Sequence, residues 1–397
     1  MIYSLIGSGP HPEVAAVNDM QWVPIGSEPL PPPLPPTRVD FTGNRSEFRK
    51  LVTKGAMLEL ITFGFYRFWL VTDIRRHLWS NTAIDGDAAE YTGRARELLF
   101  GFLVALAILV PIYVVYFLVG IEFERWKGFA STPLFVSFYA FGQFAIYRAR
   151  RYRLTRTVWR GVRFWMDGSG WAYSSRAMAW GLLMFLTLGL ALPWREASLE
   201  RYKMQHTHFG DLQGDFDGDG WEFFKRGWWL WLLTPLALLF FPAAPFLYAE
   251  FKAREWRWWL NGIRIGDVGL SSDLPHHAFY GLYWKVIGWW LLLTIIYGAY
   301  LGAAIAITVK LDLAPSAQGA APGVNIPMLV VTVIGYFALA LGANIVMRVY
   351  LQRDLWAKVL ETVEVHNIGA AADVRGSGQL ASALGEGFAD GLDVAGF

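Results

Sequence analysis

One acidic stretch of the chain has residues of the kind that bind calcium. The stretch Asp215–Glu222 reads DFDGDGWE and places carboxylates at alternate positions. A helix–loop–helix calcium loop also needs an acidic ligand at its twelfth position. Counted from Asp215, that position is occupied by Arg226. The stretch therefore predicts a β-hairpin turn and no calcium site.

Two histidine pairs are the remaining candidate metal ligands: His206 with His208, and His276 with His277. The chain has no cysteine, and neither pair has the spacing of a zinc motif. We favour histidines at a membrane interface over metal ligands. Phosphate-binding loops, dinucleotide fingerprints and nucleophile elbows are also absent from the sequence. We expect no metal, no cofactor, no catalytic residue and no enzymatic activity.

Three charged residues lie in or beside apolar segments, namely Glu59, Arg67 and Lys285. Ionisable groups inside a membrane are costly and are often functional. For Lys285 the sequence favours a side chain that reaches the interface. For Glu59 two positions fit equally: a pair with Lys54 or Arg67 inside the membrane, or a site at the headgroups. We treat all three as candidate in-membrane charges.

The composition indicates that much of the chain is solvated by lipid. Of the 397 residues, 54% are hydrophobic and 17% are charged, whereas soluble domains have roughly 25% charged residues. The windows Leu98–Val119, Tyr283–Val309 and Ile326–Met347 each hold about the 20 apolar residues that a membrane-spanning helix needs. The sequence therefore predicts a mainly α, polytopic membrane protein.

One arrangement of elements recurs along the chain. An apolar helix, a basic aromatic helix and a short β-prone stretch follow one another several times. Matches at an offset of 125 residues include Thr62 with Thr187, Gly64 with Gly189 and Arg76 with Arg201. The β-prone stretches are 82–93, 161–174, 207–220, 262–273 and 362–371. Unpaired strands cannot lie in hydrocarbon, so we expect the repeated unit to be a transmembrane helix, a basic amphipathic helix and a cytoplasmic β-hairpin.

Two apolar segments contain the same Thr-x-Gly break. They are Leu58–Trp69 and Ala177–Trp194. If every basic helix is cytoplasmic, neither segment crosses the membrane simply. We therefore predict two bent or re-entrant elements that turn at Gly64 and Gly189; full crossings are the alternative.

The distribution of basic residues predicts the orientation. The segment Arg148–Arg163 carries seven arginines, and the connections 120–132 and 310–327 carry far fewer basic residues. An excess of Lys and Arg marks the cytoplasmic side, so we expect a multi-pass protein with both termini in the cytoplasm. Arg150, Arg153 and Arg156 are candidate ligands for anionic lipid.

The chain divides into three parts by composition. Residues 1–40 form a Pro-rich N-terminal extension that ends in PLPPPLPP. Residues 41–367 form the membrane domain, with a first copy of the repeat over about 41–174, a second over about 175–275 and a third over about 276–367. Residues 368–397, rich in Gly, Ala and Asp, are expected to be a flexible tail.

One phrase resembles the signature of a known family. TFGFYRFWLVTDIRRHLWSNTAIDGDAAEYTG, over residues 62–93, is similar to that of the YjgN family of bacterial inner-membrane proteins, a family of unknown function. The residues that carry the resemblance are Thr62, Gly64, Tyr66, Trp69, Arg75, Arg76, Asn81, Thr82, Tyr91 and Gly93. The second copy departs from it, with Ala191 at the tyrosine position and His206 at the asparagine. The resemblance implies a bacterial inner (cytoplasmic) membrane location and no particular activity.

Two classes of function fit these features. The first is a membrane scaffold or interaction protein that binds partner proteins or anionic lipid through its cytoplasmic layer. The second is a transporter or channel for a small solute, which internal repeats and broken helices favour. We favour the scaffold because reactive groups are lacking, and we expect anionic membrane lipid, possible membrane-protein partners and no nucleic acid.

Overall fold

The computed structural model describes residues 35–240, 243–310, 326–378 and 380–382, except 123–126. These residues form a compact unit with eleven strands in one antiparallel sheet. The strands are β1 (Thr37–Phe41), β2 (Thr82–Ile84), β3 (Asp87–Ala88), β4 (Glu90–Tyr91), β5 (Thr157–Trp159), β6 (Val162–Met166), β7 (Thr207–Phe209), β8 (Leu212–Phe216), β9 (Ile263–Ile265), β10 (Val268–Ser272) and β11 (Val363–His366).

The sheet curves into a nearly closed barrel. Its strand order is β3-β2-β1-β11-β10-β9-β8-β7-β6-β5-β4, so the first strand of the chain pairs with the last. The two edge strands, β3 and β4, are separated by Ala89 alone. Side chains bridge this seam, because the Arg160 guanidinium binds the carboxylates of Asp85 and Asp87 and the Trp159 indole N–H donates to Asp87 O at 3.1 Å.

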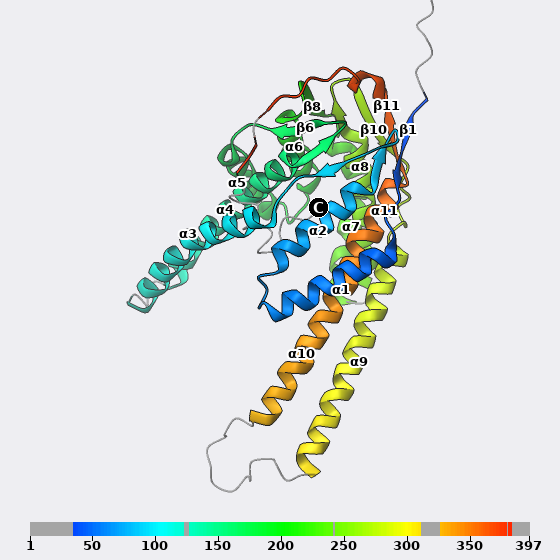
Figure 1. Cartoon of the computed structure of the whole chain (residues 1–397). Coiled ribbons are helices and arrows are strands. Elements are labelled where there is room, and N and C mark those ends of the chain that lie inside the picture. The colour runs from blue at the N-terminus through cyan, green and yellow to red at the C-terminus, as the bar shows by residue number, and fades with distance from the viewer. Residues whose placement is uncertain (1–34, 123–126, 241–242, 311–325, 379, 383–397) are drawn as a thin grey trace, which may run out of the picture. The chain divides into compact units, whose positions relative to one another are not determined.

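Helices are inserted in pairs between strands that pair directly with each other (Figure 1). They are α1 (Arg45–Ile61) and α2 (Arg67–Ser80); α3 (Ala95–Glu122) and α4 (Lys127–Thr155); α5 (Gly170–Leu186) and α6 (Leu192–Gln205); α7 (Gly220–Leu239) and α8 (Ala244–Gly262); α9 (Tyr280–Lys310) and α10 (Ile326–Met347). A π-helix, η3 (Arg348–Asp354), and α11 (Leu355–Leu360) continue α10 to β11. Consecutive helices contact each other, and α10 also contacts α1, so the helices form a ring as well.

Threonine marks the point where a second helix ends and a strand begins. The hydroxyls of Thr82, Thr157 and Thr207 donate to the carbonyls four residues earlier, at 2.8, 2.9 and 2.8 Å. Helices leave such carbonyls without a partner in their last turn. The threonine therefore satisfies the helix end while its own backbone enters the sheet.

An arginine joins neighbouring helix pairs to one another. Arg76 donates to Gly93 O at 2.8 Å and Arg201 donates to Gly218 O at 3.2 Å, in both cases across to the start of the next pair. Arg353 makes the corresponding bond to Gly43 O. Each glycine lies against the ring of the aromatic residue two positions before it, and a Cβ would meet that ring at 2.6 Å or less. Glycine at these joints is required by the close approach of the ring.

Apolar side chains fill the space that the sheet encloses. Trp159, Phe209 and Ala371 form a buried cluster to which several strands contribute. Partly buried residues packed against this cluster are Ile84, Val162, Phe164, Ile265, Val268, Ile368 and Val374. The short 3₁₀ helix η4 (Ile368–Ala371) and the chain after it thus contribute to the core of the sheet.

The predicted fold class is wrong. The chain is not plainly a polytopic helical membrane protein, because its β-prone stretches, expected as cytoplasmic hairpins of a repeated unit, form one eleven-stranded, nearly closed sheet around which the helices are arranged. The physical reason is that each short hairpin has two free edges, and pairing with the neighbouring hairpins satisfies both. The two Thr-x-Gly segments, predicted as bent or re-entrant elements, are the helix–turn–helix connections α1–α2 and α5–α6.

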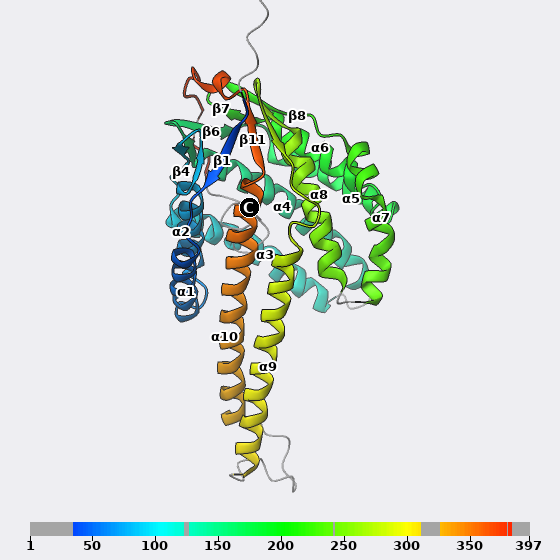
Figure 2. The same ribbon diagram turned by 90° about the vertical axis from the view of Figure 1, so that its right-hand side faces the viewer.

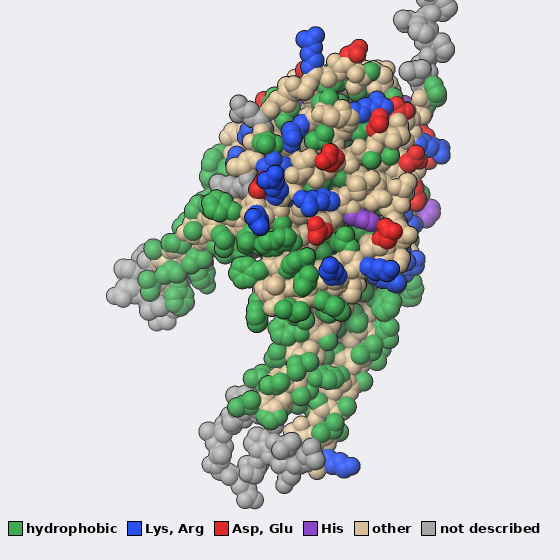
Figure 3. Space-filling view, viewed as in Figure 1, with side chains coloured by type: hydrophobic (Ala, Val, Ile, Leu, Met, Phe, Trp, Pro, Cys, Tyr) green, Lys and Arg blue, Asp and Glu red, His purple; other side chains and the backbone are tan. Residues whose placement is uncertain are grey.

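Three helices in the described part of the chain are long and apolar enough to cross a membrane. They are Ala95–Leu118, Tyr280–Lys310 and Ile326–Leu360, and they overlap the three windows that the sequence singled out. α9 and α10 lie side by side as they extend from the sheet (Figure 2). On the face shown in Figure 3, hydrophobic side chains cover the projecting parts of α3, α9 and α10, and charged ones gather around the sheet. These helices are compatible with a membrane location.

The Pro-rich extension up to residue 34 lies outside the described residues, and the division into domains stays a prediction.

The aromatic–glycine joint predicts a specific loss of stability. A Cβ at Gly218 would lie 2.4 Å from the ring of Phe216, which is buried against Trp258. We expect Gly218→Ala to lower the free energy of unfolding by about 1–3 kcal/mol, the usual cost of overpacking. Gly269→Ala is the matched control, since a Cβ there has no atom within 4 Å, and its effect should stay within about 0.5 kcal/mol. Equal denaturation midpoints of the two purified variants would contradict this account of the joint.

Candidate functional site

The Thr-x-Gly turn has the same geometry in both copies. The Thr62 hydroxyl donates to Leu58 O at 2.7 Å and accepts from the Tyr66 N–H at 2.9 Å. The Thr187 hydroxyl donates to Leu183 O at 2.8 Å and accepts from the Ala191 N–H at 3.2 Å. The threonine thus closes the first helix and opens the second, which explains why this residue type recurs.

The glycine of each turn has a positive φ, +89° at Gly64 and +90° at Gly189. The residue before it also has a positive φ, 52° at Phe63 and 50° at Leu188. A positive φ is sterically unfavourable for residues other than glycine. The side chains of both residues are exposed, Phe63 to 90% and Leu188 to 81%. Each turn therefore presents an apolar side chain outward at its apex.

The remaining family-motif residues hold this unit together and dock it to its neighbour. Tyr66 stacks on Trp69, and Asn81 donates to His77 O at 2.7 Å. Arg75 donates to the Tyr91 hydroxyl at 3.3 Å, beside the bond from Arg76 to Gly93. The motif residues are spread over two helices and the joint that follows, and these contacts describe a structural role for them.

The candidate in-membrane charges belong to three different helices, α1, α2 and α9. Glu59, in α1, pairs with Arg348, in η3, at 3.1 Å, and the two side chains are 20% and 11% exposed. Arg67 is the first residue of α2, and Lys285 is an exposed residue in the second turn of α9. Sequence reasoning missed Arg348 because it lies 289 residues from Glu59 and nothing local links the two.

Two of the three arginines predicted to bind lipid take part in ion pairs with glutamates of other helices. Arg150 binds Glu200 at 2.5 Å, and Arg156 binds Glu97 at 2.6 Å. Arg153 lies in the last turn of α4. The assignment of all three to anionic lipid stays a prediction.

Glu200 is the centre of a buried charge cluster. Its side chain, 7% exposed, lies between Arg150 from α4 and Lys203 from its own helix, α6. Burial alone would raise the pKa of this carboxyl, but the two cations outweigh burial and lower the pKa to about 2. Glu200 is therefore an anion at neutral pH and ties α6 to α4 across the intervening helix.

The histidine pairs do not form a metal centre among the described residues, where no group of three or more His, Cys, Asp or Glu converges. His206 Nδ1 lies 2.7 Å from Asp167 Oδ1, and His208 Nε2 lies 3.7 Å from Asp167 Oδ2. The acidic stretch that resembled a calcium loop is the junction between β8 and α7, where Asp219 caps the helix by accepting from the Glu222 N–H at 3.4 Å. The hairpin turn expected there is wrong, since the turn lies earlier, at Gly210 and Asp211.

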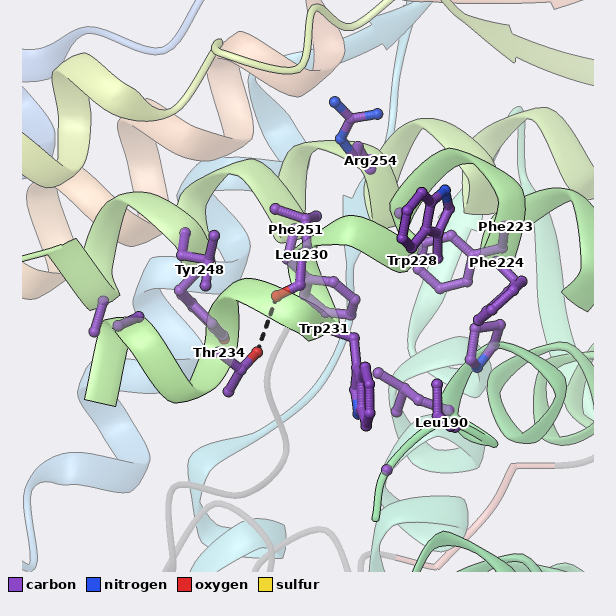
Figure 4. Close-up of a pocket in the computed structure, with 17 residues that line it drawn as sticks. Leu190, Phe223, Phe224, Trp228, Leu230, Trp231, Thr234, Tyr248, Phe251 and Arg254 are labelled. Carbon is purple, nitrogen blue, oxygen red and sulfur yellow. Dashed lines mark hydrogen bonds between the residues drawn. The ribbon is translucent and has the colours of Figure 1, made fainter. Parts of the chain in front are cut away.

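A long apolar groove lies between α7, α8 and the turn before α6 (Figure 4). It encloses about 430 Å³, within the range of small-molecule sites. Its walls are formed by Leu190, Leu192, Pro193, Phe223, Phe224, Gly227, Trp228, Leu230, Trp231, Thr234, Ala237, Ala244, Leu247, Tyr248 and Phe251, with Gly189 and Arg254 completing the lining. Of the sites described above, this groove is the one whose volume and apolar walls match those of a small-molecule binding site.

Three polar groups of the groove, on Trp231, Thr234 and Arg254, are bonded within the protein. The Trp231 indole N–H donates to Leu188 O at 3.0 Å, and the Thr234 hydroxyl donates to Leu230 O at 3.0 Å. At one end, Arg254 binds Glu250 at 2.6 Å and Arg226 O at 2.8 Å. The groove therefore favours an apolar ligand. No sequence motif predicted it, because the residues of its walls have the pattern of ordinary apolar helices.

The charge cluster at Glu200 predicts a pH-dependent contribution to stability. Glu200→Gln leaves two buried cations without their partner, which costs about 3–5 kcal/mol. Because the folded-state pKa lies below the ordinary value of 4.5, this stabilisation is complete at neutral pH and is lost as the pH falls from about 4.5 towards 2. Chemical denaturation of both proteins should show a large difference at pH 7 that shrinks over this range. The control Glu222→Gln removes an exposed pair with Arg226 and should change stability by at most about 1 kcal/mol; an equal effect of both substitutions would contradict the assignment.

Comparison with known proteins places the chain in a family. The model described as bacterial protein of unknown function (DUF898) matches it twice, over residues 36–254 and 230–391. No curated protein and no solved structure matches the chain. The matched family is the YjgN-like one, so the resemblance carried by residues 62–93 is confirmed. The chain therefore belongs to the DUF898 family of bacterial proteins of unknown function.

Proposed function

We propose that the protein is a membrane scaffold of the bacterial inner membrane, which binds partner proteins or anionic lipid through a cytoplasmic layer formed by the sheet and the adjoining helix ends. The observation that supports this proposal is the pairing of charges between helices. Glu59 with Arg348, Glu97 with Arg156 and Glu200 with Arg150 each join two different helices. Such pairs fix helices relative to one another, as a framework requires.

A transporter or channel for a small solute is the alternative. Carriers place ion- and substrate-binding groups at the interface of repeats, where alternating access rearranges them. Glu59 was the strongest candidate for such a role. Its pairing with Arg348, with both side chains largely buried, gives it a structural partner and favours the scaffold.

The placement of basic residues supports a cytoplasmic sheet. The arginines of α4 cluster in its last turns, next to β5, and on the face shown in Figure 3 most of the charged side chains lie near the sheet. The hairpin turns that join β7 to β8 and β9 to β10 lie at the end of the sheet opposite to the helices, because every helix pair leaves from the other ends of these strands. The positive-inside rule then assigns the whole sheet to the cytoplasm.

The scaffold proposal predicts that the Glu59–Arg348 pair serves stability and not activity. We expect Glu59→Gln to lower the free energy of unfolding by about 1.5–3 kcal/mol, the value of a hydrogen bond to a charged group. Proteins and lipids that co-purify in mild detergent should be unchanged, and the exchanged pair Glu59→Arg with Arg348→Glu should recover part of the stability. A folded Glu59→Gln protein that fails to complement any phenotype of a deletion strain, while retaining its partners, would instead support transport.

The orientation can be measured with single thiols, because the chain has no cysteine. Asp211→Cys and Asp267→Cys place exposed thiols in the hairpin turns, and Lys310→Cys places one at the far end of α9. A membrane-impermeant maleimide should label only Lys310→Cys in intact spheroplasts, and all three after permeabilisation. Labelling of either hairpin-turn thiol in intact spheroplasts would overturn the cytoplasmic assignment.

A further inference from the structure

We propose that the groove between α7, α8 and the Gly189 turn binds one acyl chain of a membrane phospholipid. This inference rests on the membrane location in the proposed function, but it does not depend on the scaffold role. It is supported by the composition of the groove walls, by the hydrogen bonds that Trp231 and Thr234 make within the protein, and by the direction in which the groove runs.

The groove is apolar both inside and at its rim. The lining residues Leu190, Trp228 and Trp231 are themselves 36%, 49% and 36% exposed. Beside them, Leu188 at the apex of the Gly189 turn, whose carbonyl accepts from Trp231, is 81% exposed. A rim of this kind is unfavourable in water and is satisfied when hydrocarbon surrounds it. The groove therefore opens into an apolar environment, and lipid tails are the molecules that such an environment supplies.

The chemistry of the walls favours an apolar ligand. The Trp231 indole N–H and the Thr234 hydroxyl already donate to backbone carbonyls, and most of the other wall residues are apolar. A polar ligand that used these two donors would have to displace those bonds. A flexible hydrocarbon chain makes no such demand, and the aromatic rings of Phe224, Trp231 and Phe251 offer it broad contact surfaces.

The groove has a polar end and an apolar end, in the order that a phospholipid requires. Arg254 and Arg226 are joined by a hydrogen bond at the end nearer the sheet. The other end, at Thr234, Ala237 and Ala244, lies towards the tip of the α7–α8 pair, away from the strands. α9, a candidate span, leaves the sheet on this same side of it (Figure 2). A lipid with its headgroup beside Arg254 thus has its chain directed along the membrane-spanning helices.

The experiment uses the full chain in nanodiscs of phosphatidylcholine that contain phosphatidylglycerol with a photoreactive diazirine in one acyl chain. After irradiation, mass spectrometry of peptides should locate adducts on groove residues such as Leu190, Trp231 and Tyr248. Gly227 lines the groove, and a Cβ there would have only an ordinary contact, with Leu230 Cδ1 at 4.0 Å, so Gly227→Phe should fill the groove and reduce these adducts at least tenfold.

Two further variants make the result decisive. Gly302→Phe is the matched control, because Gly302 lies exposed on α9 with no atom within 4 Å of an added Cβ; it should leave the groove adducts unchanged. Ala244→Phe fills the other end of the groove and replaces Gly227→Phe if that variant does not fold. Groove adducts that persist in a folded, filled variant would overturn the proposal. Adducts on α9 without groove adducts would refute the groove alone, and the absence of adducts anywhere would refute the membrane location as well.

Discussion

The fold depends on the requirement that every strand edge find a hydrogen-bonding partner. The strands are only two to five residues long, and a hairpin of that size is not stable in isolation. Each one therefore depends on both of its neighbours, and the sheet becomes stable only by continuing until its edges meet. The pairing of β1 with β11 joins strands from opposite ends of the described chain, and side chains bridge the seam that remains between the edge strands β3 and β4.

The helices follow from the sheet. The two strands that flank each pair of helices are hydrogen-bonded to each other. The two helices must therefore leave the sheet and return to it at neighbouring points, which places successive helices side by side. The threonine that ends a second helix and the arginine that reaches the next glycine then set the spacing between pairs. The ring of helices is thereby fixed at its sheet end, while the apolar lengths of α3, α9 and α10 extend from it to different distances.

The sequence predicted the parts better than their assembly. Long apolar windows, basic second helices and the Thr-x-Gly turns were visible because each is a local pattern with a local physical cause. The closed sheet was not, since strands such as β5, with three residues, are too short to show an alternation of their own, and strands such as β7 pair with a strand of another repeat. The same limit hid the partner of Glu59, which is brought close only by ring closure, and it hid the groove, whose walls come from α7, α8 and the turn before α6. In Asp215–Glu222 the acidic spacing was misread because Asp219 serves as a helix cap.

The pairing of β1 with β11 has a consequence for biosynthesis. β1 leaves the ribosome before the other strands of the sheet, and its partner at Val365 follows Thr37 by more than 300 residues. The barrel thus cannot be completed until β11 has been made, and until then β1 and β10 each carry an unsatisfied strand edge. The order of strands in such a sheet does not depend on where the chain begins. A circular permutant could be made by joining the segments before β1 and after β11 and opening the chain at another hairpin. It would keep the same neighbouring strands but would fold in a different order.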